Sequence, residues 1–128
     1  MIVVAIIGII AAIGVPSYTT YMEKTRRVDA VTILSEIAGE QQRFYTENNR
    51  YAADMTEMGY PDAAVLSENG FYSATVTAID GNGSSYTVTA TPVAGGAQED
   101  DTDCASFTIN SAGIKGVEGA TLTARDCW

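Results

Sequence analysis

The first 22 residues carry no charged side chain, and this feature constrains the fold of the chain more than any other. Residues 1–15 read MIVVAIIGIIAAIGV, in which nothing is more polar than glycine. As a helix this run is about 23 Å long at 1.5 Å per residue, whereas the hydrocarbon core of a bilayer is about 30 Å thick. The run is therefore a few residues short of a comfortable membrane span.

Three interpretations of this apolar segment compete. A secretory signal peptide has basic residues before its apolar run and a cleavage site after it, but nothing precedes Met1 and the run continues through Pro16 into further helical sequence. A buried core helix is the second interpretation. We favour the third, a membrane helix whose first residues precede Met1, because the missing length is what a truncated start would produce.

Residues 17–50 continue the helical pattern, so we expect one helix of about 50 residues. One mainly apolar face recurs at steps of three and four; its members are Ala30, Ile33, Leu34, Ile37, Ala38, Gln41, Phe44 and Tyr45. The stretch from Gly8 to Pro16 is the weakest part of this helix, because Gly8 and Gly14 lower helix propensity and Pro16 removes a backbone hydrogen bond. It is either a boundary between two helices or a site of bending or melting.

The rest of the chain has the pattern of a β-structure. Residues 52–70 show little periodicity and predict a long loop. Polar and apolar residues alternate over 71–79, 86–93 and 105–110, with a Gly-rich turn after Asp80, which predicts an antiparallel hairpin and a third strand. A short fourth strand is predicted at 121–123. The fold class is therefore α+β: a long N-terminal helix packed on a three- to four-stranded antiparallel sheet.

Charge separates the chain into three parts and excludes several functions. Residues 23–50 hold five acids and five bases, whereas residues 51–128 hold eleven acids against Lys115 and Arg125, so the net charge of −9 lies in this last part. The chain has no His, which excludes a Ser-His-Asp triad and His metal ligands. An acidic body is a poor partner for nucleic acid, which binds through Lys and Arg.

The sequence indicates no catalytic, cofactor-binding or metal site. The densest acidic run, residues 99–103, lacks the Gly-centred twelve-residue loop of a common calcium site. We interpret it as a solvated loop. Lys24, Arg26 and Arg27 follow the apolar segment and are expected to meet lipid headgroups or the acids of a neighbouring subunit.

Cys104 and Cys127 are the only cysteines. They are either free thiols of a cytosolic protein or one disulfide of an exported protein. The apolar start favours export. A bond would close a loop of 24 residues including both cysteines and would contribute about 3 kcal/mol in the chain-entropy model.

Residues 1–18, MIVVAIIGIIAAIGVPSY, closely resemble the N-terminal helix of type IV pilins. The resemblance extends more weakly over the rest of the chain, through Tyr45, Tyr51, the stretch 58–60, the run 107–110 with Gly113, and Cys127-Trp128. Cys104 and Cys127 match the cysteines of the pilin disulfide. The resemblance therefore implies the pilin fold, a C-terminal disulfide loop and a structural, non-enzymatic role.

The resemblance also implies a subunit of a bacterial surface filament used for adhesion, motility or DNA uptake. Its partners would be other copies of itself, the inner membrane before assembly, the pilus assembly machinery and a prepilin peptidase. The leader, the methylated N-terminus and the assembly glutamate of such proteins would all precede Met1. In assembled pili of the family, the helix melts between a Gly and a Pro, which maps onto Gly8, Gly14 and Pro16.

We accordingly expect residues 1–22 to be the membrane and filament-core half of the helix and residues 23–128 to be the globular head. The head divides into the amphipathic helix half 23–50, the connecting loop 51–70 and the sheet and disulfide region 71–128. The filament core would be built from exposed apolar side chains, namely Ile2, Val3, Ile6, Ile7, Ile9, Ile10 and Ile13. Direct binding of nucleic acid by this subunit is not expected.

Two alternatives remain. A pseudopilin of a type II secretion system commonly binds calcium where this chain has its two cysteines, which makes that interpretation less favoured. A membrane-anchored binding module that works as a monomer would form no helical filament, so electron microscopy separates it from a pilin.

Overall fold

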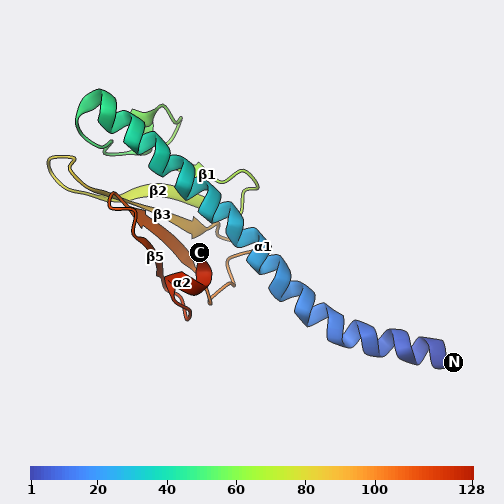
Figure 1. Cartoon of the computed structure of the whole chain (residues 1–128). Coiled ribbons are helices and arrows are strands. Elements are labelled where there is room, and N and C mark those ends of the chain that lie inside the picture. The colour runs from blue at the N-terminus through green and yellow to red at the C-terminus, as the bar shows by residue number, and fades with distance from the viewer.

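The computed structural model in Figure 1 has one long helix lying across one face of an antiparallel sheet. It describes the backbone of residues 1–128 and the side chains of all residues except those at positions 15–17, 19, 20, 78 and 79. This arrangement confirms the α+β class predicted from the sequence.

Helix α1 runs from Ile2 to Asn48 without interruption. Its 47 residues correspond to about 70 Å at 1.5 Å per residue, which confirms the prediction of a single helix of about 50 residues. The helix ends at Asn49, which adopts a left-handed conformation (φ 56°) and donates its backbone N–H to the carbonyl of Tyr45 at 2.7 Å. Asn is one of the residues that tolerates this conformation at a helix end.

The first third of α1 projects away from the sheet (Figure 1), and residues 1–14 are all exposed. Among the residues that the structure describes, no helical stretch is long and apolar enough to cross a bilayer.

The sheet has five strands in the order β1-β2-β3-β4-β5, each antiparallel to its neighbour. The strands are β1 (Ala64–Leu66), β2 (Tyr72–Ile79), β3 (Tyr86–Pro92), β4 (Ser106–Asn110) and β5 (Lys115–Glu118). The three longer strands confirm the prediction within one or two residues at each end. A register shift between Val76 and Ala78 marks a β-bulge in β2.

Three details of the predicted sheet were wrong. The predicted count of three to four strands misses β1, which lies with a short 3-10 helix, Met55–Met58, in the segment expected to be a loop. The strand predicted at 121–123 is absent; these residues lead into a short helix, α2 (Ala124–Cys127). The last strand is β5 instead, because the side chain of Asn110 accepts hydrogen bonds from the backbone of Ala112 and Ile114 and turns the chain back beside β4.

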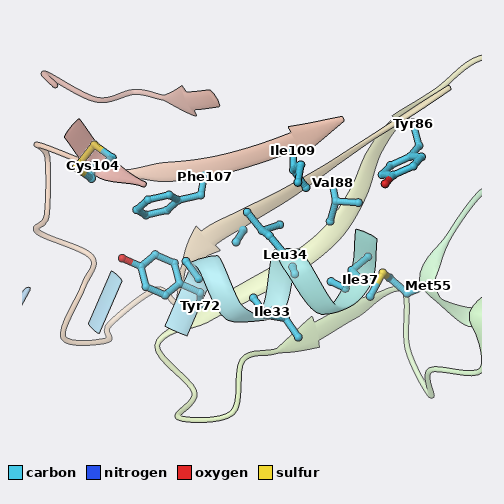
Figure 2. Packing of buried hydrophobic residues seen from close by; sticks show 14 of the residues in the cluster. Ile33, Leu34, Ile37, Met55, Tyr72, Tyr86, Val88, Cys104, Phe107 and Ile109 are labelled. Atoms are coloured by element: carbon cyan, nitrogen blue, oxygen red, sulfur yellow. A yellow bond between two sulfur atoms is a disulfide. The ribbon is translucent and has the colours of Figure 1, made fainter. Parts of the chain in front are cut away.

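The core lies between α1 and the sheet (Figure 2). From the helix, Leu34 and Ile37 are fully buried, and they face Val88 and Phe107 on the central strands. The predicted apolar helix face is thus largely confirmed. Tyr45 is an exception, because it is 41% exposed at the end of the helix, where the sheet no longer covers it.

Two contacts fasten the chain that leaves α1. The amide of the fully buried Gln41 both donates to and accepts from the backbone of Ala52, at 3.1 and 2.8 Å. The carbonyl of Gly83 in the β2–β3 turn accepts the N–H of Tyr51 at 2.8 Å. Gly83 has φ 69°, and a Cβ there would lie 3.0 Å from the Cβ of Arg50, so this close approach requires glycine.

Candidate functional site: the exposed helix and the disulfide clasp

Exposed apolar side chains cover the free part of α1. The seven residues predicted for a filament core are 51% to 77% exposed; they are Ile2, Val3, Ile6, Ile7, Ile9, Ile10 and Ile13. The structure therefore brings these residues together on one projecting helical rod, outside the core of the head. A monomer in water gains nothing from such a surface, whereas a covering partner removes it from water.

The predicted weak stretch of the helix is only partly described. Gly8 and Gly14 both lie within α1, and a Cβ added to either would meet nothing within 4 Å. The prediction for Pro16 falls outside the described residues, because its side chain is not among those that the structure describes. Packing within the chain therefore leaves room for a side chain at Gly8 and at Gly14.

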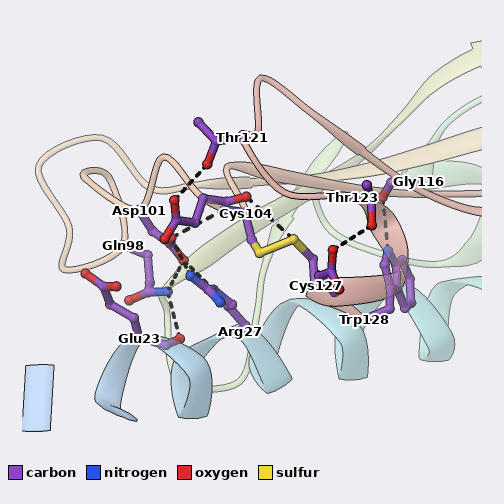
Figure 3. The surroundings of a disulfide bond; sticks show 12 residues. Glu23, Arg27, Gln98, Asp101, Cys104, Gly116, Thr121, Thr123, Cys127 and Trp128 are labelled. Carbon is purple, nitrogen blue, oxygen red and sulfur yellow. Dashed lines mark hydrogen bonds and ion pairs between the residues drawn. A yellow bond between two sulfur atoms is a disulfide. The ribbon is translucent and has the colours of Figure 1, made fainter. Parts of the chain in front are cut away.

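Cys104 and Cys127 form the predicted disulfide. Both cysteines are buried, and their bond joins the loop before β4 to α2 (Figure 3). The C-terminus is fastened further by Trp128, whose indole N–H donates to the carbonyl of Gly116 at 3.0 Å and whose ring packs edge-on against Phe107. The disulfide and Trp128 together hold the C-terminus against the last two strands.

A buried ion pair lies beside the disulfide. The guanidinium of Arg27 on α1 donates two hydrogen bonds to the carboxylate of Asp101, at 2.6 and 2.7 Å. Both side chains are buried, with 8% and 1% of their surface exposed. The same carboxylate accepts the backbone N–H of Cys104 at 3.4 Å, so Asp101 connects the helix to the disulfide (Figure 3). We call this group, Arg27, Asp101 and Gln98, the clasp.

Gln98 completes the clasp from the same loop. It is fully buried, and its amide donates to the hydroxyl of Tyr72 at 3.0 Å and to the backbone carbonyl of Glu23 at 3.2 Å. The hydrogen bonds to Asp101 raise the pKa of the Arg27 guanidinium, against the opposing effect of burial. Burial raises the pKa of the Tyr72 phenol, although the Gln98 hydrogen bond acts in the other direction. The clasp thus holds the loop 93–104 on α1.

Sequence reasoning missed the clasp. It assigned residues 99–103 to a solvated loop, which is wrong for Asp101, since this carboxylate is 1% exposed. It assigned Arg27 to lipid headgroups or to a neighbouring subunit, whereas its partner belongs to the same chain. One signal was available: Arg27 precedes Ala30 and Leu34 by three and seven residues, which places it on the buried helix face, where a charge needs a partner.

The clasp joins the loop 93–104 to α1, whereas residues 2–14 of the helix are exposed. Among the side chains that the structure describes, no group of three or more His, Cys, Asp or Glu converges as a metal-binding set would. Arg26 lies over the ring of Phe71 at 5.3 Å, and Lys115 lies over Trp128 at 5.2 Å. The arrangement consists of a head, fastened at its C-terminus by the disulfide and Trp128, and an uncovered apolar rod.

Comparison with known proteins agrees with this arrangement. Residues 16–108 match the family model described as "Type IV minor pilin ComP, DNA uptake sequence receptor". A fimbrial protein of Eikenella corrodens, EcpC, is 33% identical over 126 residues, which cover 98% of this chain and 68% of that protein. The type IV major pilin protein PilA of Myxococcus xanthus is 38% identical over 60 residues, which cover 47% of this chain and only 27% of that protein.

The fold also has a counterpart among solved structures. A type IV pilin from Shewanella oneidensis superposes with a TM-score of 0.56 over 83% of this chain and 97% of that one, at 22% identity. This likeness confirms the pilin fold expected from the sequence. The extent of the family match and of the EcpC alignment settles the family: this chain is a type IV pilin, a member of a family of non-enzymatic proteins of cell-surface pili.

Proposed function

We propose that this chain is the structural subunit of a helical surface filament and that it polymerises through the exposed first part of α1. The observation that carries the proposal is the contrast between a head with a buried apolar core and a rod whose seven large apolar side chains are all 51% to 77% exposed. Complete burial of one such side chain contributes about 1.5–3 kcal/mol. Several of them, covered by several neighbours, would offset the cost of ordering subunits in a polymer.

In this proposal, residues 1–22 form the filament core and residues 23–128 form its coat. The division is supported by charge, since residues 1–22 carry none and residues 51–128 carry the net charge of −9. Repeated with every subunit, that charge would make the outside of the filament strongly acidic. Before assembly, the apolar rod would lie in the inner membrane, where a prepilin peptidase and the pilus assembly machinery would act on the subunit.

The proposal includes a local loss of helix on assembly, between Gly8 and Pro16. Gly8 and Gly14 each disfavour helix by about 1 kcal/mol relative to Ala, and Pro lacks the N–H of the helical hydrogen bond. Melting this stretch would let neighbouring rods adjust their lengths in a crowded core. The remaining helix would keep its contacts with the head.

Adhesion, motility and DNA uptake are the roles that such a filament would serve. The matched family model is named for a receptor of DNA uptake sequences. We propose that this subunit does not itself hold DNA, because residues 51–128 offer two bases against eleven acids. Three of the other five bases, Arg27, Arg43 and Arg50, are already in ion pairs with acids of the same chain. DNA uptake by the filament would then depend on a different subunit.

A matched pair of substitutions tests assembly. Ile9 on the rod and Ile114 on the head are exposed to nearly the same extent, 62% and 65%. We expect Ile9→Lys to abolish filaments in sheared cell-surface preparations, because the ammonium would be buried without a partner. Ile114→Lys should leave them at the wild-type level. Equal filament yields from the two variants would contradict assembly through the rod, and a wild-type protein that stays monomeric would favour the monomeric anchor.

A further inference from the structure

The outward face of the three central strands is built mainly from hydroxyl side chains. α1 covers one face of the sheet, and the opposite face is turned away from it (Figure 1). Alternate residues of a strand point to opposite faces, and the register places eight hydroxyls of β2, β3 and β4 on the outward side. We call this set the hydroxyl face; its members are Ser73, Ser106 and the six threonines Thr75, Thr77, Thr87, Thr89, Thr91 and Thr108.

The hydroxyl face carries no charge. β2, β3 and β4 contain no charged residue, although residues 51–128 hold eleven acids and two bases. Threonine suits exposed strands, but this preference alone does not remove the Lys and Glu that ordinarily share such surfaces with it. Acids lie at the border of the face instead: Glu118 pairs with Ser106 on the β5 side, and Asp80 follows the end of β2. The neutral face is therefore bordered by negative charge.

Five hydroxyls of this face are available to a ligand. Thr77 and Thr89 are hydrogen-bonded to each other at 2.8 Å, and Thr91 donates to the carbonyl of Ser73 at 3.4 Å. Within the part of the chain that the structure describes, the other hydroxyls make no hydrogen bond, and all are half-exposed; they belong to Ser73, Thr75, Thr87, Ser106 and Thr108. A partner that covers them must supply hydrogen bonds of its own, because an apolar cover would leave these donors unsatisfied.

The hydroxyl face consists of short side chains that offer methyl groups beside their hydroxyls. Gly116 on β5 lies opposite Thr108, and a Cβ there would lie 2.6 Å from the Thr108 hydroxyl, so the glycine leaves room for that hydroxyl. On the β1 side, Leu66 lies opposite Ser73 and is 60% exposed, which adds an apolar contact. Neighbouring strands lie about 4.8 Å apart and alternate residues of a strand about 7 Å apart. Polar and apolar groups therefore recur at short intervals in both directions.

A neutral polysaccharide has the matching chemistry. Its sugar rings carry hydroxyls that both donate and accept hydrogen bonds, and C–H groups that can contact the threonine methyls. It has no charge for the surrounding acids to repel, whereas nucleic acids and acidic polysaccharides do. We propose that the hydroxyl face binds a neutral polysaccharide chain lying across β2, β3 and β4. This inference rests on the proposed function and gives the adhesive role of the filament a class of ligand.

Binding through this face depends on many copies of it. Each available hydroxyl exchanges a hydrogen bond with water for one with the sugar, so a single subunit gains little affinity. A filament presents the same face on every subunit, and linked sites exceed the affinity of one site by about 10²–10⁴-fold. We therefore expect filaments to be retained under conditions in which the detergent-extracted subunit is washed away.

A triple variant tests the hydroxyl face. Thr75→Val, Thr87→Val and Thr108→Val together remove three available hydroxyls and keep the size and strand preference of the side chains. Wild-type filaments should sediment with regenerated amorphous cellulose at low and at high salt, and the triple variant should lower the retained fraction at least tenfold. The matched control changes the same three residues to Ser, which keeps the hydroxyls and should keep the binding. Equal retention of the wild type and the valine variant would overturn the proposal.

Coated beads separate this proposal from the proposed function. Beads that carry the detergent-extracted subunit at high density, coupled through its N-terminus, present many copies without a filament and should also be retained by cellulose. A wild-type chain that forms no filaments, but whose beads bind cellulose, would contradict the proposed function alone. Filaments and beads that bind neither cellulose nor chitin, another neutral polysaccharide, would overturn the role of the hydroxyl face. Side-by-side bundling of filaments that the valine variant abolishes, without any retention by cellulose, would also overturn it, because the face would then contact a second copy.

Discussion

At the scale of single residues, the head depends on charges and hydroxyls that are buried with partners. Arg27 and Asp101 are 74 positions apart in sequence and form a bidentate pair that is almost closed to water. Burying two charges costs several kcal/mol, which the pair recovers only through its geometry and further hydrogen bonds. Asp101 meets both conditions, because its pairing with Arg27 is bidentate and its carboxylate also accepts the N–H of Cys104.

Asp101→Asn should therefore destabilise the head strongly. The substitution leaves the Arg27 guanidinium buried without a counter-charge, and we expect the free energy of unfolding to fall by about 3–5 kcal/mol, measured by urea denaturation. The double variant Arg27→Met, Asp101→Leu should recover most of this loss, since it removes both charges. If the single and double variants lost the same stability, the pairing would not be what holds the loop.

Alkaline pH should destabilise the head through two buried tyrosines, Tyr72 and Tyr86, and the half-buried Tyr60. Burial raises the pKa of Tyr60, Tyr72 and Tyr86 above the usual value of about 10. Between pH 10 and the raised values, the unfolded chain loses these protons and the folded chain keeps them, so stability is complete below pH 10 and declines above it. Tyr86→Phe should make this decline shallower in denaturation measured from pH 8 to 11. An unchanged slope would contradict the prediction.

At the scale of elements, the disulfide ties α2 to the loop before β4. It closes 24 residues, including both cysteines, that contain two strands and a helix. The clasp fastens the loop before the disulfide to α1. After the disulfide, Trp128 fastens the C-terminus to β5. Each of these contacts joins segments that are distant in sequence.

Reduction of the disulfide should lower the free energy of unfolding by about 3 kcal/mol in the chain-entropy model. Thermal denaturation with and without a thiol reductant measures this loss. The double variant Cys104→Ser, Cys127→Ser serves as the control, because its melting temperature should not respond to the reductant. A wild-type head that melts at the same temperature in both conditions would show that the loop is held by other contacts.

The hydrophobic pattern of the sequence predicted those helices and strands whose own residues show a clear helical or alternating spacing. The helix face at Ile33, Leu34 and Ile37 and the alternation in β2, β3 and β4 are local signals, and both were confirmed. β1 is three residues long and β5 contains a glycine, so neither has enough alternation to be recognised. They become strands only because a neighbouring strand pairs with them. Asp101 was missed for a similar reason, since its partner lies 74 residues away.

At the scale of the whole molecule, the chain combines a charge-free rod, a helix that is covered on one side, and an acidic head. The family and fold are those of a type IV pilin. The proposed assembly through the rod would cover its exposed isoleucines, and the net charge of −9, which lies in residues 51–128, would then face outward.

The acidic head leads to a prediction about DNA. At physiological salt, the purified subunit should not retard duplex DNA in a gel-shift assay, because few phosphate contacts are available to release counterions. A retarded band that weakens steeply as salt is raised would contradict this prediction and would transfer the receptor role to this subunit.

The most direct test of the account is a cryo-electron microscopy reconstruction of the filament formed by this chain. We expect residues 2–13 of every subunit to lie in the filament interior, packed against the helices of other copies, and residues 51–128 to form the outer surface. A filament whose isoleucine rods face solvent, or whose subunits contact one another only through their heads, would contradict assembly through the exposed helix.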